Sequence, residues 1–218
     1  NVHLLNLSQS DYCEIIENEF YDHHRAALLL LTSDNNLVRR NYSNERGVGG
    51  DEAFTIYPGN ANILENNIVE GEDVGFTTEV LGPALGNKWY GNITYGCTTS
   101  FQIRARDLTN CADGEIYNHV AVATDGLTAM YFRGTKDVKV YHASLWMTNA
   151  SGSGIGADVE TGNEGCGVYT GWVVQDTHAV GAAGGTGFGA SGAITLVWNE
   201  VNSYGFGTVL RPEEVHRV

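Results

Sequence analysis

The chain has 218 residues, of which 28 are glycine, and its 26 acidic and 12 basic residues give a formal net charge of -14. A hydrophobic content of 42% is enough for a packed core, so we do not expect a disordered chain. The acidic balance leaves no basic surface to neutralise phosphates, which excludes nucleic acid as a partner. The longest apolar run, Ala26–Leu31, is far shorter than the roughly 20 residues that cross a bilayer, so we expect no membrane span.

The first expected element is a short helix after Cys13. Ile16, Phe20 and His23 are spaced to share one helical face, and Asp11 is placed to cap the first turn. Because the apolar run that starts at Ala26 follows without a breaker, a pair of strands is the alternative.

The middle of the chain has the pattern of a β protein. Short stretches rich in β-branched and aromatic residues are separated by glycine, proline and Asp-Gly turn signals. The expected strands are Leu37–Tyr42, Ala53–Tyr57, Asn62–Val69, Val74–Leu81, Asn92–Cys97, Ser100–Arg106, Ile116–Thr124, Thr128–Arg133 and Val138–Thr148.

The last third is rich in glycine, with 13 of the 28 glycines between Ala150 and Gly192. We expect long loops there, interrupted by one strand at Gly167–Val174. The segments Ala193–Val201 and Tyr204–Leu210 predict a terminal hairpin.

These patterns predict one all-β domain over residues 1–218, with residues 1–35 as an N-terminal segment and residues 150–192 as glycine-rich loops. An antiparallel β-sandwich or jelly roll is the expected architecture. We find no repeat with a period of 20–50 residues, and on that ground a solenoid is not expected.

The four cysteines favour two disulfides over buried thiols. Cys97 and Cys111 bracket a segment long enough to fold back on itself, and Cys13–Cys166 is then the second bridge. Three pairings are formally possible, and the spacing does not choose among them.

Four N-x-S/T sequons favour a glycosylated protein at the cell exterior or on a virion surface. Their asparagines are Asn6, Asn41, Asn92 and Asn149.

We find no convincing catalytic or nucleotide-binding pattern, so the chain is not expected to be an enzyme. The glycine run Gly181–Gly192 lacks the lysine of a phosphate loop, since the last lysine is Lys139, and it precedes a β-rich segment rather than a helix. No G-x-S-x-G elbow is present. No cofactor is expected.

Two groups of residues are candidate ligand sites. Trp89 and Tyr90, with Asn87 beside them, form an aromatic pair of the kind that stacks on sugar rings, although a core position is the alternative. Glu70, Glu72 and Asp73 surround a glycine and are weak candidates for calcium ligands, with an exposed acidic turn as the alternative.

Three functional classes agree with these observations. The first is a structural protein of an extracellular particle, such as a virion coat, a spike or a filament subunit, whose partner is itself or other surface subunits. The second is a lectin-like domain that binds a glycan or a receptor, and the third is a secreted hydrolase. The all-β pattern, the glycine-rich loops, the acidic surface, the sequons and the lack of a convincing catalytic set favour the first class.

Overall fold

The computed structural model describes residues 3–45, 51–80, 82, 84–105, 112–126, 128–133, 135–149, 152–158, 169–181, 186–190 and 194–204. Within these ranges the chain forms strands and turns only, and it contains no helix long and apolar enough to cross a membrane. The expected helix after Cys13 is wrong, because two short strands with turns between them occupy that segment.

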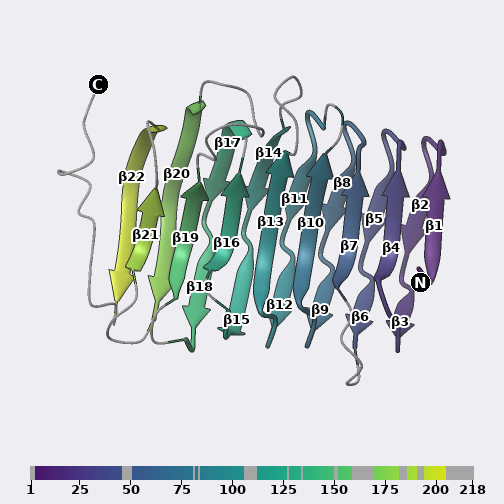
Figure 1. Cartoon of the computed structure of the whole chain (residues 1–218), viewed down its shortest axis with the longest axis horizontal. Coiled ribbons are helices and arrows are strands. Elements are labelled where there is room, and N and C mark those ends of the chain that lie inside the picture. Colours follow the sequence, from purple (N-terminus) through teal and green to yellow (C-terminus); the bar gives the residue numbers. More distant parts are fainter. Residues whose placement is uncertain are drawn as a thin grey trace.

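The strands belong to two sheets in which every recorded pairing is parallel and follows the order of the chain (Figure 1). The first sheet consists of β1 (Leu5–Ser8), β4 (Ala26–Leu31), β7 (Glu52–Tyr57), β10 (Val74–Val80), β13 (Thr99–Ala105), β16 (Thr128–Arg133), β19 (Ser153–Asp158) and β21 (Thr186–Ala190).

The second sheet has two arms. The first arm consists of β2 (Glu14–Ile16), β5 (Leu37–Arg39), β8 (Ile63–Glu65), β11 (Lys88–Tyr90), β14 (Ala112–Tyr117) and β17 (Thr135–Tyr141). The second arm consists of β3 (Glu19–Tyr21), β6 (Tyr42–Asn44), β9 (Ile68–Glu70), β12 (Ile93–Tyr95), β15 (Val120–Thr124) and β18 (Ser144–Met147). The long strand β20 (Tyr169–Val180) joins the arms by pairing with both β17 and β18, and β22 (Ile194–Tyr204) pairs with β20.

The chain is therefore a parallel β-solenoid, in which each coil adds one strand to the first sheet and one to each arm. The expected antiparallel sandwich or jelly roll is wrong, and so is the exclusion of a solenoid. Residues stacked in adjacent coils are 22 apart at Phe54 and Phe76 but 29 apart at Phe101 and Met130, so no fixed period is visible along the chain. The expected terminal hairpin is also wrong over its described part, because residues 194–204 form the single strand β22 parallel to β20.

Each coil turns its corners with the same device. The corner between the two arms has a residue with positive φ, such as Arg40 (φ 53°) or Asn66 (φ 54°), followed by an inward-pointing residue. Glycine adopts positive φ without a steric penalty, and asparagine tolerates it better than most residues. This corner breaks the strand, which is why the arms consist of strands of only a few residues.

Buried asparagines stack at these corners. Asn41 Oδ1 accepts the backbone N–H of Asn18 at 2.9 Å, and Asn67 Oδ1 accepts that of Asn41 at 2.9 Å. Asn92 continues the column by accepting the N–H of Asn67 at 2.9 Å. Buried backbone groups that the sharp turn would leave unpaired are satisfied in this way.

The core lies between the two sheets and consists of stacked apolar side chains. One row of the first sheet contributes Phe54, Phe76 and Phe101, whose neighbouring ring centroids are 5.5 and 6.5 Å apart. The ring of Trp89 approaches Phe101 from the opposite arm at 4.9 Å in an edge-to-face arrangement. Such pairs add to the stabilisation from burial alone.

Candidate functional site

The outer face of the first sheet is polar along much of its length. The register of β7, β10, β13 and β16 aligns Tyr57 near Glu79, Glu79 with Arg104, and Arg104 with Arg133. A second outward row contains Thr55, Thr77, Gln102 and Tyr131. Because adjacent strands are about 4.8 Å apart, polar groups recur at that interval along the solenoid axis.

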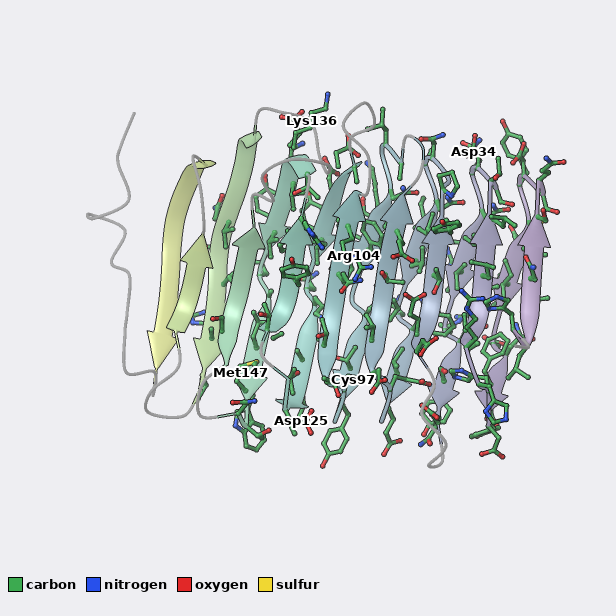
Figure 2. The ribbon with its side chains drawn as sticks, viewed as in Figure 1. Asp34, Cys97, Arg104, Asp125, Lys136 and Met147 are labelled. Carbon is green, nitrogen blue, oxygen red and sulfur yellow. The ribbon has the colours of Figure 1, made fainter. Side chains whose placement is uncertain are left out.

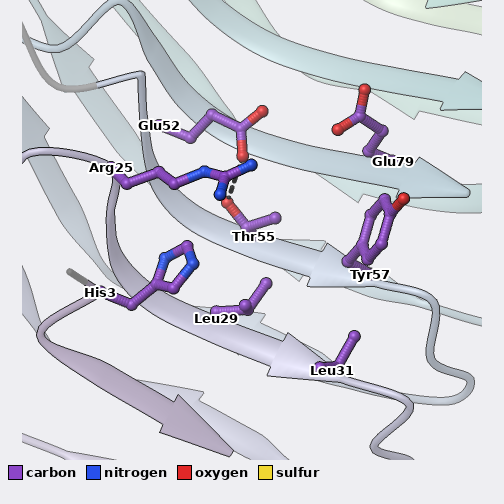
Figure 3. A pocket seen from close by; sticks show the side chains of 8 residues that line it. All are labelled: His3, Arg25, Leu29, Leu31, Glu52, Thr55, Tyr57 and Glu79. Carbon is purple, nitrogen blue, oxygen red and sulfur yellow. Dashed lines mark hydrogen bonds between the residues drawn. The ribbon is translucent and has the colours of Figure 1, made fainter. Parts of the chain in front are cut away.

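A pocket of about 310 Å³ opens at one end of this polar track (Figure 3). Leu29 and Leu31 of β4 lie at its base, and Tyr57 and Glu79 come from the strands that follow. The lining residues are His3, Arg25, Leu29, Leu31, Glu52, Thr55, Tyr57 and Glu79. Figure 3 shows Arg25, Glu52 and Thr55 grouped together, with Tyr57 farther along the face.

The two carboxylates of the pocket have different environments. Burial raises the pKa of Glu52, and the nearby charges of Glu79 and Asp51 raise it further, against the opposing hydrogen bond from Thr55. Thr55 Oγ1 donates to Glu52 Oε2 at 2.8 Å. Glu79 Oε1 instead accepts a hydrogen bond from the Arg104 guanidinium at 2.6 Å, in an ion pair whose side chains are 16% and 26% exposed.

The pocket therefore combines hydrogen-bonding, aromatic and apolar groups. Carboxylates accept hydrogen bonds from hydroxyls, the exposed guanidinium of Arg25 donates them, and the ring of Tyr57 offers an aromatic face. Leucine side chains supply an apolar floor for the C–H groups of a sugar ring. None of these residues was a candidate from the sequence. The alternation of apolar and polar residues within 53–57 and 74–81 is the signal from which some outward-pointing side chains are predictable.

The structure separates the predicted aromatic pair. Trp89 is 1% exposed and packs in the core, and Asn87 is fully buried as a member of a second asparagine column. Their burial leaves neither side chain at a surface where a sugar could reach it. Tyr90 alone is half-buried on the outer side of the first arm, where its ring packs against that of Tyr117 at a tilt of 31° with centroids 5.3 Å apart.

The weak calcium candidates are not gathered around a common point. Glu72 is buried and bonds His23, while Glu70 accepts hydrogen bonds from Tyr42 and Asn44 on the outer face of the second arm. No group of three or more His, Cys, Asp or Glu side chains suited to a metal occurs among the residues that the structure describes.

The predicted disulfides are wrong for the two cysteines that the structure describes. Cys13 and Cys97 are both free, and burial raises the pKa of the Cys97 thiol to about 12. Cys97 lies at a corner along one long edge of the solenoid, near Asp125 and Met147 in the view of Figure 2. Cys111 and Cys166 lie outside the described residues.

Two of the four sequons coincide with the asparagine column. The amide nitrogens of Asn41 and Asn92 donate to the backbone carbonyls of Ile15 and Leu64, each at 2.8 Å, so the folded solenoid has no room for a glycan on either. Asn6 is exposed in β1, and Asn149 follows β18 and donates to the carbonyl of Asp125 at 2.9 Å. Glycosylation at these last two positions stays a prediction.

The outer face of the second arm carries charge at Glu19 and Glu70, but over β12, β15, β18 and the end of β20 it is apolar, unlike the outer face of the first sheet. Five of the eight large hydrophobic residues exposed in the described part of the chain lie here: Ile68, Ile93, Tyr95, Trp146 and Val180. A second hollow of about 310 Å³ lies beside Trp146 and Val180. We call this surface the apolar face.

No family model, curated protein or solved structure matches the chain. The geometry of its own two outer faces is therefore the basis for a functional assignment.

Proposed function

We propose that this solenoid is a carbohydrate-binding protein, and that an extended glycan lies along the outer face of the first sheet with one sugar in the pocket at Tyr57. The observation that carries the proposal is the combination in one pocket of an aromatic ring, two carboxylates, a guanidinium and a leucine floor. The polar rows that continue over β10, β13 and β16 offer hydrogen-bonding groups to further sugars.

The charge distribution favours a neutral or amino-bearing glycan. A net charge of -14 repels polyanions at long range, and both pocket carboxylates accept hydrogen bonds from hydroxyl or ammonium groups. Glu79 is engaged in an ion pair with Arg104, and the sequence contains no catalytic pattern that points to a hydrolase. We therefore propose binding without hydrolysis.

The test is a glycan array probed with the unmodified chain, followed by titration calorimetry with the glycan of highest signal. We expect Tyr57→Ala and Glu52→Gln each to weaken binding by about tenfold or more, since each removes one recognition element. Tyr117→Ala is the matched control, because Tyr117 is a half-buried tyrosine on the other sheet. Equal affinity of all variants, or no binding to any glycan, would sink the proposal.

A second candidate function is self-assembly into an extracellular or virion-surface particle. The apolar face supports it, because the outward positions Ile93, Tyr95, Val120, Val122, Ser144, Trp146, His178 and Val180 include no Asp, Glu, Lys or Arg. An extended apolar surface on an acidic chain is typical of an interface between subunits.

Analytical ultracentrifugation tests this second candidate. We expect concentration-dependent oligomers that strengthen with added salt, since salt screens the repulsion between acidic copies. Trp146→Ser should return the chain to monomers, whereas Tyr57→Ala should not. A monomer at every concentration and salt level would contradict self-assembly through this face.

A further inference from the structure

A buried ion pair links the first and third coils at the corner between the second arm and the first sheet. His23 follows β3 in the first coil, and Glu72 follows β9 in the third. Their side chains are both 0% exposed, and His23 Nε2 lies 2.8 Å from Glu72 Oε1. The contact therefore crosses the whole second coil.

The second coil contributes to the same contact through Ser43 of β6. Its hydroxyl donates to Glu72 Oε1 at 2.8 Å and lies 3.2 Å from His23 Nε2. The second carboxylate oxygen of Glu72 is buried and makes no hydrogen bond with the residues that the structure describes. Among the described side chains, it is therefore His23 that compensates the negative charge of the Glu72 carboxylate.

The surroundings of the pair are acidic. Burial of the imidazole is the largest single effect and lowers the pKa of His23, but it is outweighed by the sum of the hydrogen bond and charge of Glu72, the charge of Glu45 and the backbone of Arg25. The net effect is a pKa above the usual 6.5. Asp73, next to Glu72 in sequence, has its pKa raised by burial and by the charges of Glu45, Asp51 and Asp125.

We propose that His23 and Glu72 form a proton-dependent clasp across the first three coils, which holds the turn Asp22–Arg25 in place while His23 is protonated and releases it when the proton is lost. Loss of the proton leaves a buried carboxylate without a compensating cation, which is costly in a dry interior. The turn that carries His23 also carries Arg25, which lines the pocket on the outer face of the first sheet. The role of the clasp as a regulator of ligand binding rests on the proposed function, whereas the clasp itself does not.

The sign of the pH dependence follows from the raised pKa of His23. Its contribution to stability is fully present below the unfolded-state value of about 6.5 and is lost as the pH rises through the folded-state value. His119 loses its proton far below neutral pH, because complete burial lowers its pKa to about 3. The clasp is therefore tested above neutrality, where His119 does not titrate.

Hydrogen exchange of the full chain, followed by mass spectrometry between about pH 6 and pH 9, tests the clasp without any ligand. After correction for the intrinsic exchange rate, we expect protection of residues 22–28 to fall roughly tenfold for each pH unit between the unfolded-state and folded-state pKa of His23. Protection of β16 and β19, which lie farther along the solenoid than the strands that contact the pair, should not change over this pH range.

Two variants serve as matched controls. The double variant with His23→Gln and Glu72→Gln keeps two hydrogen-bonding side chains without charge, so its protection should be independent of pH in this range. His24→Gln changes the exposed neighbouring histidine and should leave the wild-type pH dependence intact. Titration of the His23 imidazole by NMR in the unmodified chain provides a readout that needs no variant.

The proposal is overturned by any of three results. These are protection of residues 22–28 that is constant with pH, a pH dependence that survives in the double variant, or a folded-state pKa of His23 at or below its unfolded value. None of these results bears on glycan binding at the pocket, which the array and the Tyr57 variant test separately.

Discussion

At the scale of single residues, the fold depends on polar side chains that point inward at the corners. Asn67 illustrates this: its Oδ1 accepts from the backbone and side chain of Asn41 at 2.9 and 3.1 Å, and its Nδ2 donates to Val38 O and Asn92 Oδ1, both at 3.0 Å. The column thus connects three successive coils through one fully buried amide.

We expect Asn67→Ala to lower the free energy of unfolding by roughly 2–4 kcal/mol, because it leaves several buried polar groups unpaired. Urea denaturation measures the change. Asn6→Ala in β1 is the control, since Asn6 is exposed and its loss should change stability by less than about 0.5 kcal/mol. Equal effects of the two substitutions would show that the column does not stabilise the fold.

Individual residues also explain why the candidate site was misplaced. Trp89 and Asn87 follow glycines in a segment that has the composition of a loop, yet Asn87 points inward at the corner after Gly86 and Trp89 is the buried residue of β11. The residues that do line the pocket come from four separate segments: His3, residues 25–31, β7 and β10. Their proximity depends on the stacking of coils, which no local pattern reveals.

At the scale of elements, the sequence predicted the β character and the positions of many strands. Ala53–Tyr57, Thr128–Arg133 and Val138–Thr148 each overlap strands of the structure. The same patterns did not predict pairing direction, because a strand with a buried and an exposed face alternates in the same way in parallel and antiparallel sheets. The segment after Cys13 was ambiguous for a different reason: the corner at Glu17 (φ 58°) divides it into two strands too short for a clear period of two.

The first sheet also constrains side-chain size where it meets the second arm. A Cβ atom on Gly75 of β10 would lie 2.7 Å from the backbone oxygen of Ser100 and 2.6 Å from Thr94 Cγ2. The backbone oxygen belongs to the neighbouring strand, so it cannot move without disturbing the sheet.

We therefore expect Gly75→Ala to destabilise the chain by about 1–3 kcal/mol through overpacking. Thermal unfolding followed by circular dichroism provides the measurement. Gly156→Ala in β19 is the comparison, because its Cβ would meet only the Thr128 side chain, at 3.0 Å or more, and the effect should be smaller. A neutral Gly75→Ala would mean that β10 and β13 are farther apart than described.

At the scale of the whole molecule, the solenoid separates two surfaces of opposite character. The first sheet presents carboxylates, guanidinium groups and hydroxyls, whereas the apolar face of the second arm presents Ile68, Ile93, Tyr95, Trp146 and Val180. This division follows from the stacking of coils, since equivalent outward positions of successive coils form continuous rows. The glycine content and the net charge of the sequence predict neither surface, because each is a property of the chain as a whole.

Hydroxyl-radical footprinting of the chain with and without its bound glycan tests the central claim most directly. Tyr57 of the pocket and Tyr95 and Trp146 of the apolar face are aromatic reporters on the two surfaces. We predict that the glycan protects Tyr57 from oxidation and leaves Tyr95 and Trp146 unchanged. Protection of Tyr95 and Trp146 with Tyr57 unaffected would contradict the assignment of glycan binding to the first sheet.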